Sequence, residues 1–198
     1  MKPKSLEAKN KIIDAALELM QQQGYEGMTV EEIITAANIS VGTFYHYFKS
    51  KADILQEAFR TMDKYFEEYV VGKLGDEHSS IDRITQFFHH YALHTTTVGI
   101  DNIRSIYSMN NPMFKTKRQM EVFLEDIIHD GQAKGEITTS IPAEEIRRYF
   151  FILIRGVIFD WCVHAGSYNL EEEVNKYIKI QINAFKPLSS DISNKIQT

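Results

Sequence analysis

A chain of 198 residues with 43% hydrophobic residues can bury a sizeable core and is too apolar to be a disordered tail. The net charge of −5 at pH 7 does not suggest a nucleic-acid ligand, but six lysines balance six acidic residues within the first 51 residues, so the acidic surplus lies beyond them. A single cysteine excludes an intramolecular disulfide, and the absence of a signal-like or membrane-spanning apolar run leads us to expect a cytoplasmic protein with no membrane partner.

Three helices are predicted in the first 50 residues. The first spans about residues 5–23 and is expected to end at Gly24 with a left-handed cap. Its apolar stripe, spaced i, i+3, i+4 and i+7, consists of Ile13, Ala16, Leu17 and Met20. Thr29 is positioned to cap a second helix, and Ser40 to cap a third that ends near Lys49.

Six further helices are predicted, so the chain is expected to be all-α with about nine helices. Most of them begin at a serine or asparagine that can cap a helix, or at a proline. Their expected ranges are 50–71, 79–97, 102–108, 112–134, 142–164 and 169–185. No segment alternates as a strand does, and the polar tail from Pro187 is expected to be frayed.

Residues 29–48 have the pattern of a helix-turn-helix. Such a motif needs a small residue near the turn, which Ala36 provides, and apolar side chains that lock two helices at a steep angle. The expected locking residues are Ile33, Ala37, Ile39, Phe44 and Phe48. On periodicity alone, the same stretch could equally be a helical hairpin packed on the first helix.

The third helix would present Gly42, Thr43, Tyr45, His46 and Tyr47 outward. Their hydroxyls and ring nitrogens can bond phosphates, and the threonine methyl group can contact base edges in the major groove. Free N–H groups at the helix starts can bind phosphate oxygens. The residues expected to contact DNA are Thr29, Ser40, Val41, Gly42, Thr43, Tyr45, His46, Tyr47 and Lys51.

The same region resembles the TetR family of bacterial repressors. The resemblance covers residues 10–55 and rests on Ile13–Leu17, Gly24-Tyr25, Thr29-Val30, Ile39–Phe48 and Lys49–Leu55. The chain departs from the family at Ile34-Thr35, where many members have an alanine followed by a less bulky residue. The positions that the resemblance matches to operator contacts are Thr43, Tyr45, His46 and Lys51.

The resemblance and the residue pattern together predict the domain organisation. We expect a helix-turn-helix domain at residues 1–51, a ligand-binding and dimerisation domain at 52–186, and a flexible tail at 187–198. The predicted function is a sequence-specific regulator, a repressor that a small-molecule effector releases from its operator. No cofactor is expected. The alternative is a helical ligand-binding protein or enzyme without DNA affinity.

The segment from Tyr149 to Val163 is apolar almost all round, so a helix there needs partners on every side. A second subunit would supply one of them, and the resemblance implies the same dimerisation helices. The expected interface residues are Phe150, Ile154, Gly156, Val157, Trp161, Val174, Tyr177, Ile178 and Phe185. A two-fold dimer would read a near-palindromic DNA operator with two recognition helices.

Residues 52–155 are rich in aromatic side chains, which are more often core than pocket. The TetR resemblance, however, implies an apolar effector cavity with a few polar groups among these helices. The candidate ligand-binding residues are Phe66, Phe87, Tyr91, His94, Arg104, Tyr107, Phe123, Phe151 and Arg155.

Two groups invite other chemistry. His90 and His94 lie four residues apart, with His89 beside them, but no HExxH pattern or carboxylate pair supports a metal site. Cys162 in its apolar segment is expected to be a buried, inert thiol rather than a redox sensor. Because GxSxG, P-loop and dinucleotide motifs are also absent, we expect no enzyme activity.

Overall fold

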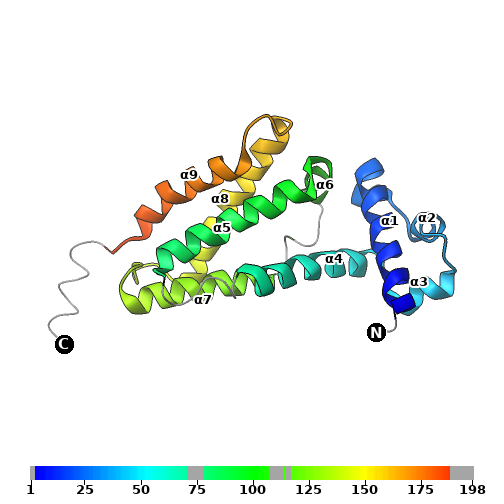
Figure 1. Ribbon diagram of the computed structural model, residues 1–198, viewed down its shortest axis with the longest axis horizontal. Helices are drawn as coiled ribbons and strands as arrows, with labels where there is room; N and C mark the ends of the chain where they lie inside the picture. The colour runs from blue at the N-terminus through cyan, green and yellow to red at the C-terminus, as the bar shows by residue number, and fades with distance from the viewer. Residues whose placement is uncertain (1–2, 71–77, 108–113, 115–116, 188–198) are drawn as a thin grey trace. The chain divides into compact units, whose positions relative to one another are not determined.

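The computed structural model describes residues 3–70, 78–107, 114 and 117–187. These residues form nine α-helices and no strand, so the expectation of an all-α chain is confirmed (Figure 1). The helices are α1 (Pro3–Gly27), α2 (Val30–Ala36), α3 (Val41–Tyr47), α4 (Lys51–Tyr65), α5 (Ser80–Val98), α6 (Ile100–Ile106), α7 (Gln119–Lys134), α8 (Ala143–Val163) and α9 (Leu170–Ile182). The predicted tail from residue 188 onward lies outside the described residues.

The chain divides into two compact units. Unit 1 consists of Met1–Lys64 and Asp101–Thr116, and unit 2 of Tyr65–Ile100 and Lys117–Thr198. Unit 1 therefore holds α1 to α4 with most of α6, whereas α5, α7, α8 and α9 belong to unit 2. The boundary at residue 51, which was drawn by expected role, stays a prediction.

The core of unit 1 joins α1, α2, α3 and the start of α4. Its fully buried side chains include Ile12, Ala16, Met20, Met28, Ile33, Phe44, Ile54 and Leu55. The stripe of α1 is thus centred on Ile12, and the predicted Ile13 and Leu17 are only partly buried at its edge. The apolar stripe of a helix can be wider than 100°, so the sequence does not show which of its residues will be most deeply buried. That depends on where the partner helices pack. From α6, Ile106 packs against the same core.

Gly24 does not end α1 as predicted. Its backbone has a positive φ of 76°, but its ψ of 167° lies outside the left-handed helical region. The chain kinks there and continues for one more helical turn to Gly27. A glycine therefore stands where a positive φ is needed, while the helical turn that follows it was not expected from the sequence.

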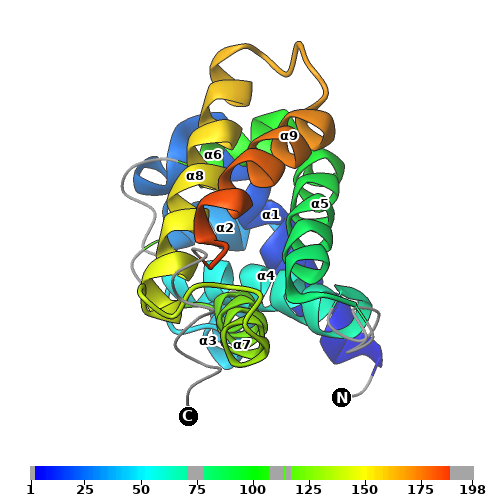
Figure 2. The same ribbon diagram turned by 90° about the vertical axis from the view of Figure 1, so that its left-hand side faces the viewer.

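In unit 2, α9 lies between α8 and α5 and contacts both (Figure 2). The seventh helix α7, which contacts α5 and α8, begins at Gln119 rather than near Pro112. Arg118, which precedes it, is extended, and most of residues 108–116 lie outside the described part of the chain. The predicted fourth helix also changes character, because the segment Phe66–Val70 is a π-helical turn. No helix in the described ranges is both long and apolar enough to span a bilayer.

Candidate nucleic-acid interface and ligand unit

The start of α2 is fixed by the capping box that the sequence predicts. The Thr29 hydroxyl accepts a hydrogen bond from the Glu32 N–H at 3.2 Å, and the Glu32 carboxylate accepts one from the Thr29 N–H at 2.8 Å. The bonds from Thr29 lower the pKa of the Glu32 carboxyl below its ordinary value. Ser40 caps α3 in the same manner, since its hydroxyl accepts from the Thr43 N–H at 3.1 Å.

The turn between α2 and α3 holds the two helices as a helix-turn-helix requires. Asn38 has a φ of 51°, a left-handed conformation that asparagine tolerates better than most residues. Ile39, the other residue of the turn, is partly buried against the core. The locking side chains Ile33, Ala37, Phe44 and Phe48 are buried, as predicted.

Most residues on α3 that do not lock the motif face solvent. Val41 is 59% exposed and Tyr45 56%, which is unusual for side chains of this size, and His46 is also exposed. Thr43 is half-buried, and its hydroxyl lies 2.8 Å from that of Ser40. The predicted outward position of Tyr47 needs correction, because its half-buried ring packs against the core of unit 1.

Lys51 occupies a different environment from the one predicted. Its ammonium donates hydrogen bonds to the backbone carbonyls of Tyr25 at 2.8 Å, Met28 at 3.0 Å and Glu26 at 3.4 Å. The same nitrogen lies 4.6 Å from the centroid of the Tyr25 ring. The charge is therefore used within unit 1, at the end of α1.

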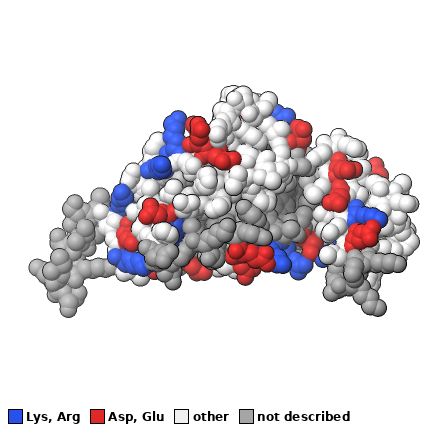
Figure 3. Space-filling view, viewed as in Figure 1, with Lys and Arg blue, Asp and Glu red and all other residues white. Residues whose placement is uncertain are grey.

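Charged side chains are distributed without a single-sign patch on the face that Figure 3 shows. Lys and Arg side chains alternate there with Asp and Glu side chains over each unit. On the face shown, a broad basic surface is therefore not what would mark a DNA-binding site. The signal lies instead in the exposed side chains and capped ends of α2 and α3.

Four of the residues predicted to line an effector site form one aromatic cluster in unit 2. Phe66 lies 5.1 Å from Phe87 and 5.8 Å from Tyr91, measured between ring centroids, and Phe151 lies 6.1 Å from Tyr91. The guanidinium of Arg155 is 5.6 Å from the Phe151 ring. All four aromatic residues are buried and pack on one another.

The other ligand candidates are not all brought to this cluster. Arg104 and Tyr107 belong to unit 1, where Arg104 is exposed and lies 3.6 Å from Asp101. Phe123 is half-buried on α7. His94 in unit 2 is largely buried, and this burial together with the positive charge of Arg118 lowers the pKa of its imidazole. The neighbouring His89 lies 3.2 Å from the Asn175 side chain, between Nδ1 and Nδ2.

Sequence reasoning missed a buried ionic network between α7 and α8. Arg147 bonds both Glu121 and Glu125, with 2.8 Å between its Nε and the Glu125 carboxylate. Lys117 reaches the same Glu125 oxygen at 2.7 Å, and Arg155 lies 3.4 Å from Glu121. A signal was present in the sequence, because Glu121 lies three residues before the buried Leu124 and thus on the apolar stripe of its helix.

The dimer residues predicted on α8 and α9 need a correction. Seven of the nine are covered by unit 2 itself, namely Phe150, Ile154, Val157, Trp161, Val174, Ile178 and Phe185. Gly156 and Tyr177 remain exposed. Because α8 is apolar on both faces, its sequence did not distinguish the face that packs on α5, α7 and α9 from the one left open. The large apolar side chains on the open surface of α8 and α9 are Tyr149, Ile152, Phe159, Val163, Tyr177 and Ile180.

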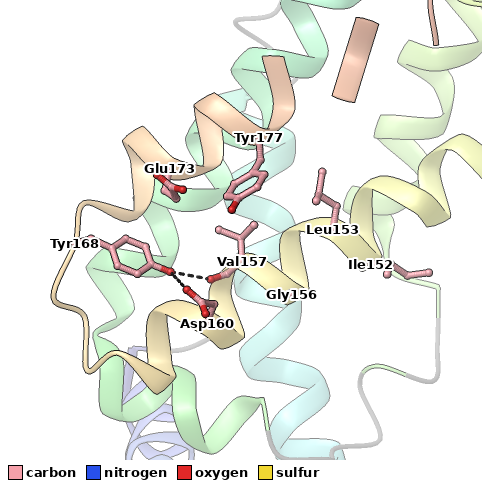
Figure 4. Close-up of a pocket in the computed structure, with 8 residues that line it drawn as sticks. All are labelled: Ile152, Leu153, Gly156, Val157, Asp160, Tyr168, Glu173 and Tyr177. Carbon is pink, nitrogen blue, oxygen red and sulfur yellow. Dashed lines mark hydrogen bonds between the residues drawn. The ribbon is translucent and has the colours of Figure 1, made fainter. Parts of the chain in front are cut away.

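A groove of about 600 Å³ runs along this open surface between α8 and α9 (Figure 4). Its lining residues are Ile152, Leu153, Gly156, Val157, Asp160, Tyr168, Glu173 and Tyr177. The Tyr168 hydroxyl donates to the Asp160 carboxylate at 2.8 Å, and burial together with this bond raises the pKa of Tyr168. No atom within 4 Å would meet a Cβ at Gly156, so the floor of the groove is open there.

Two family models match the chain. Residues 12–58 match bacterial regulatory proteins of the tetR family, and residues 106–184 match the C-terminal region of YsiA-like proteins. The first model spans the helix-turn-helix, and the second spans α7, α8 and α9 of unit 2.

Individual relatives agree with these models. The chain is 22% identical to the fatty acid metabolism regulator protein of Bacillus subtilis, over 87% of this chain and 92% of that protein. It is 32% identical to the biofilm operon negative transcriptional regulator IcaR of Staphylococcus aureus, over 40% of this chain and 42% of IcaR. The solved structure of FadR from Bacillus subtilis with stearoyl-CoA matches at a TM-score of 0.70, with 23% identity over 87% of this chain and 96% of FadR.

Proposed function

This chain belongs to the tetR family of bacterial regulatory proteins and is a DNA-binding transcriptional regulator, and from that premise we propose that it is a dimeric repressor which a small molecule releases from a near-palindromic operator. The observation that carries the proposal is the exposed face of α3 on a helix-turn-helix whose ends are capped. Such a regulator works where the chromosome is, in the bacterial cytoplasm.

The proposed reading head uses the exposed side chains of α3. Val41 and the methyl group of Thr43 suit thymine methyl groups, while Tyr45 and His46 suit phosphate oxygens or base edges. Gly42 supports close approach, because a Cβ there would meet only the Ser40 hydroxyl, at 3.9 Å. Thr29 and Ser40 lie at the starts of α2 and α3, where the free N–H groups would bind phosphate oxygens of the operator.

The proposed dimer forms through the open apolar surface of α8 and α9. Ile152, Phe159 and Val163 are 59–62% exposed on α8, and large side chains of this kind rarely gather on a monomer surface without a partner. The groove beside Gly156 would receive side chains of the second copy. A two-fold arrangement would place two α3 helices on successive half-sites.

The DNA proposal is tested by gel shift with DNA from upstream of the protein's own gene. We expect affinity to fall steeply as salt rises, because bound phosphates release counterions. Thr43→Ala and Tyr45→Ala should each weaken binding by about tenfold, the loss expected from one or two base contacts. Gln56→Ala on the exposed surface of α4 serves as the control. Unchanged affinity and sequence preference in both α3 variants would show that α3 does not read DNA.

For the effector, we propose an amphipathic anion of the acyl-CoA class, bound in unit 2. FadR from Bacillus subtilis, which shares the fold of this chain, has been solved in complex with stearoyl-CoA. Unit 2 offers chemistry that suits such a ligand, because the Arg155 guanidinium lies 5.6 Å from the ring of the buried Phe151 and the buried Arg118 adds a second cationic group beside His94.

Stearoyl-CoA tests the effector class directly. It should raise the melting temperature of the protein and release the operator in a gel shift, since a ligand stabilises the state that binds it. Free CoA and stearate are the matched controls for the headgroup and the chain. If stearoyl-CoA acts no better than either of them, the acyl-CoA class is wrong, while the DNA proposal stands unaffected.

A further inference from the structure

The ammonium of Lys51 joins two points of unit 1 that lie far apart in the sequence. Lys51 is the first residue of α4, and its three carbonyl partners lie 23 to 26 residues earlier, two in the last turn of α1 and one, Met28, directly after it. A lysine ammonium has three N–H donors and no acceptor. With three carbonyls around it, every donor has a backbone acceptor within unit 1.

The carbonyls need this partner because the N–H groups that would bond them in a continuous helix belong to the capping box of α2. In a continued helix, the Tyr25 carbonyl would accept from the Thr29 N–H and the Met28 carbonyl from the Glu32 N–H. Those two N–H groups donate instead to the Glu32 carboxylate and the Thr29 hydroxyl. The Lys51 ammonium therefore supplies hydrogen-bond donors in place of the two N–H groups that the capping box uses.

We propose that Lys51 is a positioning residue of the DNA-reading head, which holds the connection between α1 and α2 by its carbonyls and so sets Thr29 relative to α3, rather than binding an operator phosphate. This inference rests on the proposed DNA-binding function. Lys51 acts through the connection, because the residues it holds lead directly into the N-cap of α2.

Substitution of Lys51 by arginine or by methionine distinguishes a positioning role from a phosphate contact. If Lys51 bound a phosphate, Lys51→Arg would keep its charge and most of the affinity, whereas Lys51→Met would lose both. If Lys51 holds the three carbonyls, a planar guanidinium cannot reproduce the three donors of one ammonium nitrogen and methionine has no donor, so both variants should lose affinity by about tenfold or more. The matched control Lys49→Met removes an exposed lysine two residues away.

The salt dependence of operator binding gives the second readout. Loss of one phosphate contact should reduce the slope of log K against log salt by about 0.9, whereas loss of positioning leaves the lines parallel. We expect parallel lines for Lys51→Met and Lys51→Arg. A shallower slope in Lys51→Met, or wild-type affinity in Lys51→Arg, would overturn the inference.

Coupling to Thr29 distinguishes positioning from a general role in stability. For folded protein, with helicity checked by circular dichroism, Lys51→Arg combined with Thr29→Ala should lose little more affinity than the larger single loss. Fully additive losses would contradict action through Thr29. If no Lys51 variant folds, the wild-type protein decides the question, because the Lys51 ammonium protons should stay protected by NMR and unshifted when operator is added. A shift of that resonance would indicate a phosphate contact.

Binding of operator by the wild-type protein separates the two claims. If the wild-type protein does not bind DNA with a salt-dependent affinity, the proposed function fails. If it binds and the Lys51 variants behave as phosphate contacts do, only the present inference fails.

Discussion

At the residue scale, Gly131 is a position where the absence of a side chain is required by packing. A Cβ added there would lie 2.6 Å from Cδ1 of Ile137 and 2.8 Å from Cβ of Ser80. Gly131→Ala should therefore lower the free energy of unfolding by about 1–3 kcal/mol, as overpacking does. Urea denaturation measures the loss. The double variant with Ile137→Val removes the closest methyl group and should recover part of it, and a stable single variant would contradict the close packing.

His94 gives unit 2 a dependence on pH. Burial and Arg118 hold the pKa of its imidazole below the ordinary value of 6.5, so the unfolded chain takes up this proton first as the pH falls. The stability that neutral His94 contributes above pH 6.5 is then lost as the pH falls through that value. The free energy of unfolding of the wild-type protein should decrease more between pH 7.5 and about 5.5 than that of His94→Gln.

The comparison of the two proteins isolates this effect. The other six histidines are common to both and cancel in the difference. Neighbouring cations hold the pKa values of the Glu125 and Asp130 carboxyls below their ordinary values, so the stability that these carboxylates contribute is lost only at lower pH. Parallel pH profiles for the wild-type protein and His94→Gln would show that His94 does not titrate across folding.

At the scale of elements, α7 and α8 are joined by buried charges. Arg147 and Glu121 are both less than 10% exposed, and removal of one partner leaves the other charge buried without full compensation. Arg147→Met should lower the free energy of unfolding by about 3 kcal/mol, measured by urea denaturation. Arg148→Met changes the exposed neighbour on the same helix and should cost less than about 0.5 kcal/mol. Equal losses in the two variants would show that the network contributes nothing.

The helix starts were predictable where the signal is local. Thr29, Ser40, Ser79 and Asn169 each cap the helix that the sequence assigns to them, because a cap depends on residues within one turn. The start of α7 was not predictable in this way. Its N-cap Arg118 makes no side-chain cap bond, so the sequence carries no capping signal there.

In the candidate DNA-binding site too, features that depend on nearby residues were predictable from the sequence, and features that depend on distant residues were not. Exposure of Tyr45 and His46 followed from the spacing of the residues that lock the helix-turn-helix. The place of Lys51 did not follow, because its partners are backbone carbonyls more than 20 residues away and no side-chain pattern marks them. Long-range contacts with backbone atoms leave little trace in a single sequence.

At the scale of the whole molecule, the apolar composition of α8 predicts a partner but not the face that it covers. Ile152, Phe159 and Val163 repeat at intervals of seven and four residues, which places them on one stripe of the helix. Seven of the nine residues predicted for the interface instead fill the core of unit 2, and only Gly156 and Tyr177 stay exposed. One apolar face of α8 is therefore covered by unit 2, and the other remains exposed. A second copy of the chain is the partner that a two-fold symmetric assembly would supply for the exposed face.

The proposed dimer is tested at Phe159, which is 60% exposed. Phe159→Asp should yield a monomer in sedimentation experiments, because two copies would each bury an unpaired carboxylate in an apolar interface. Leu93→Asp places the same charge on an exposed apolar position of α5 and should remain dimeric. The monomer should also bind a full operator no more tightly than a single half-site, since the second α3 no longer contributes effective concentration. A Phe159→Asp protein that sediments as a dimer would mean that this surface of α8 is not the interface.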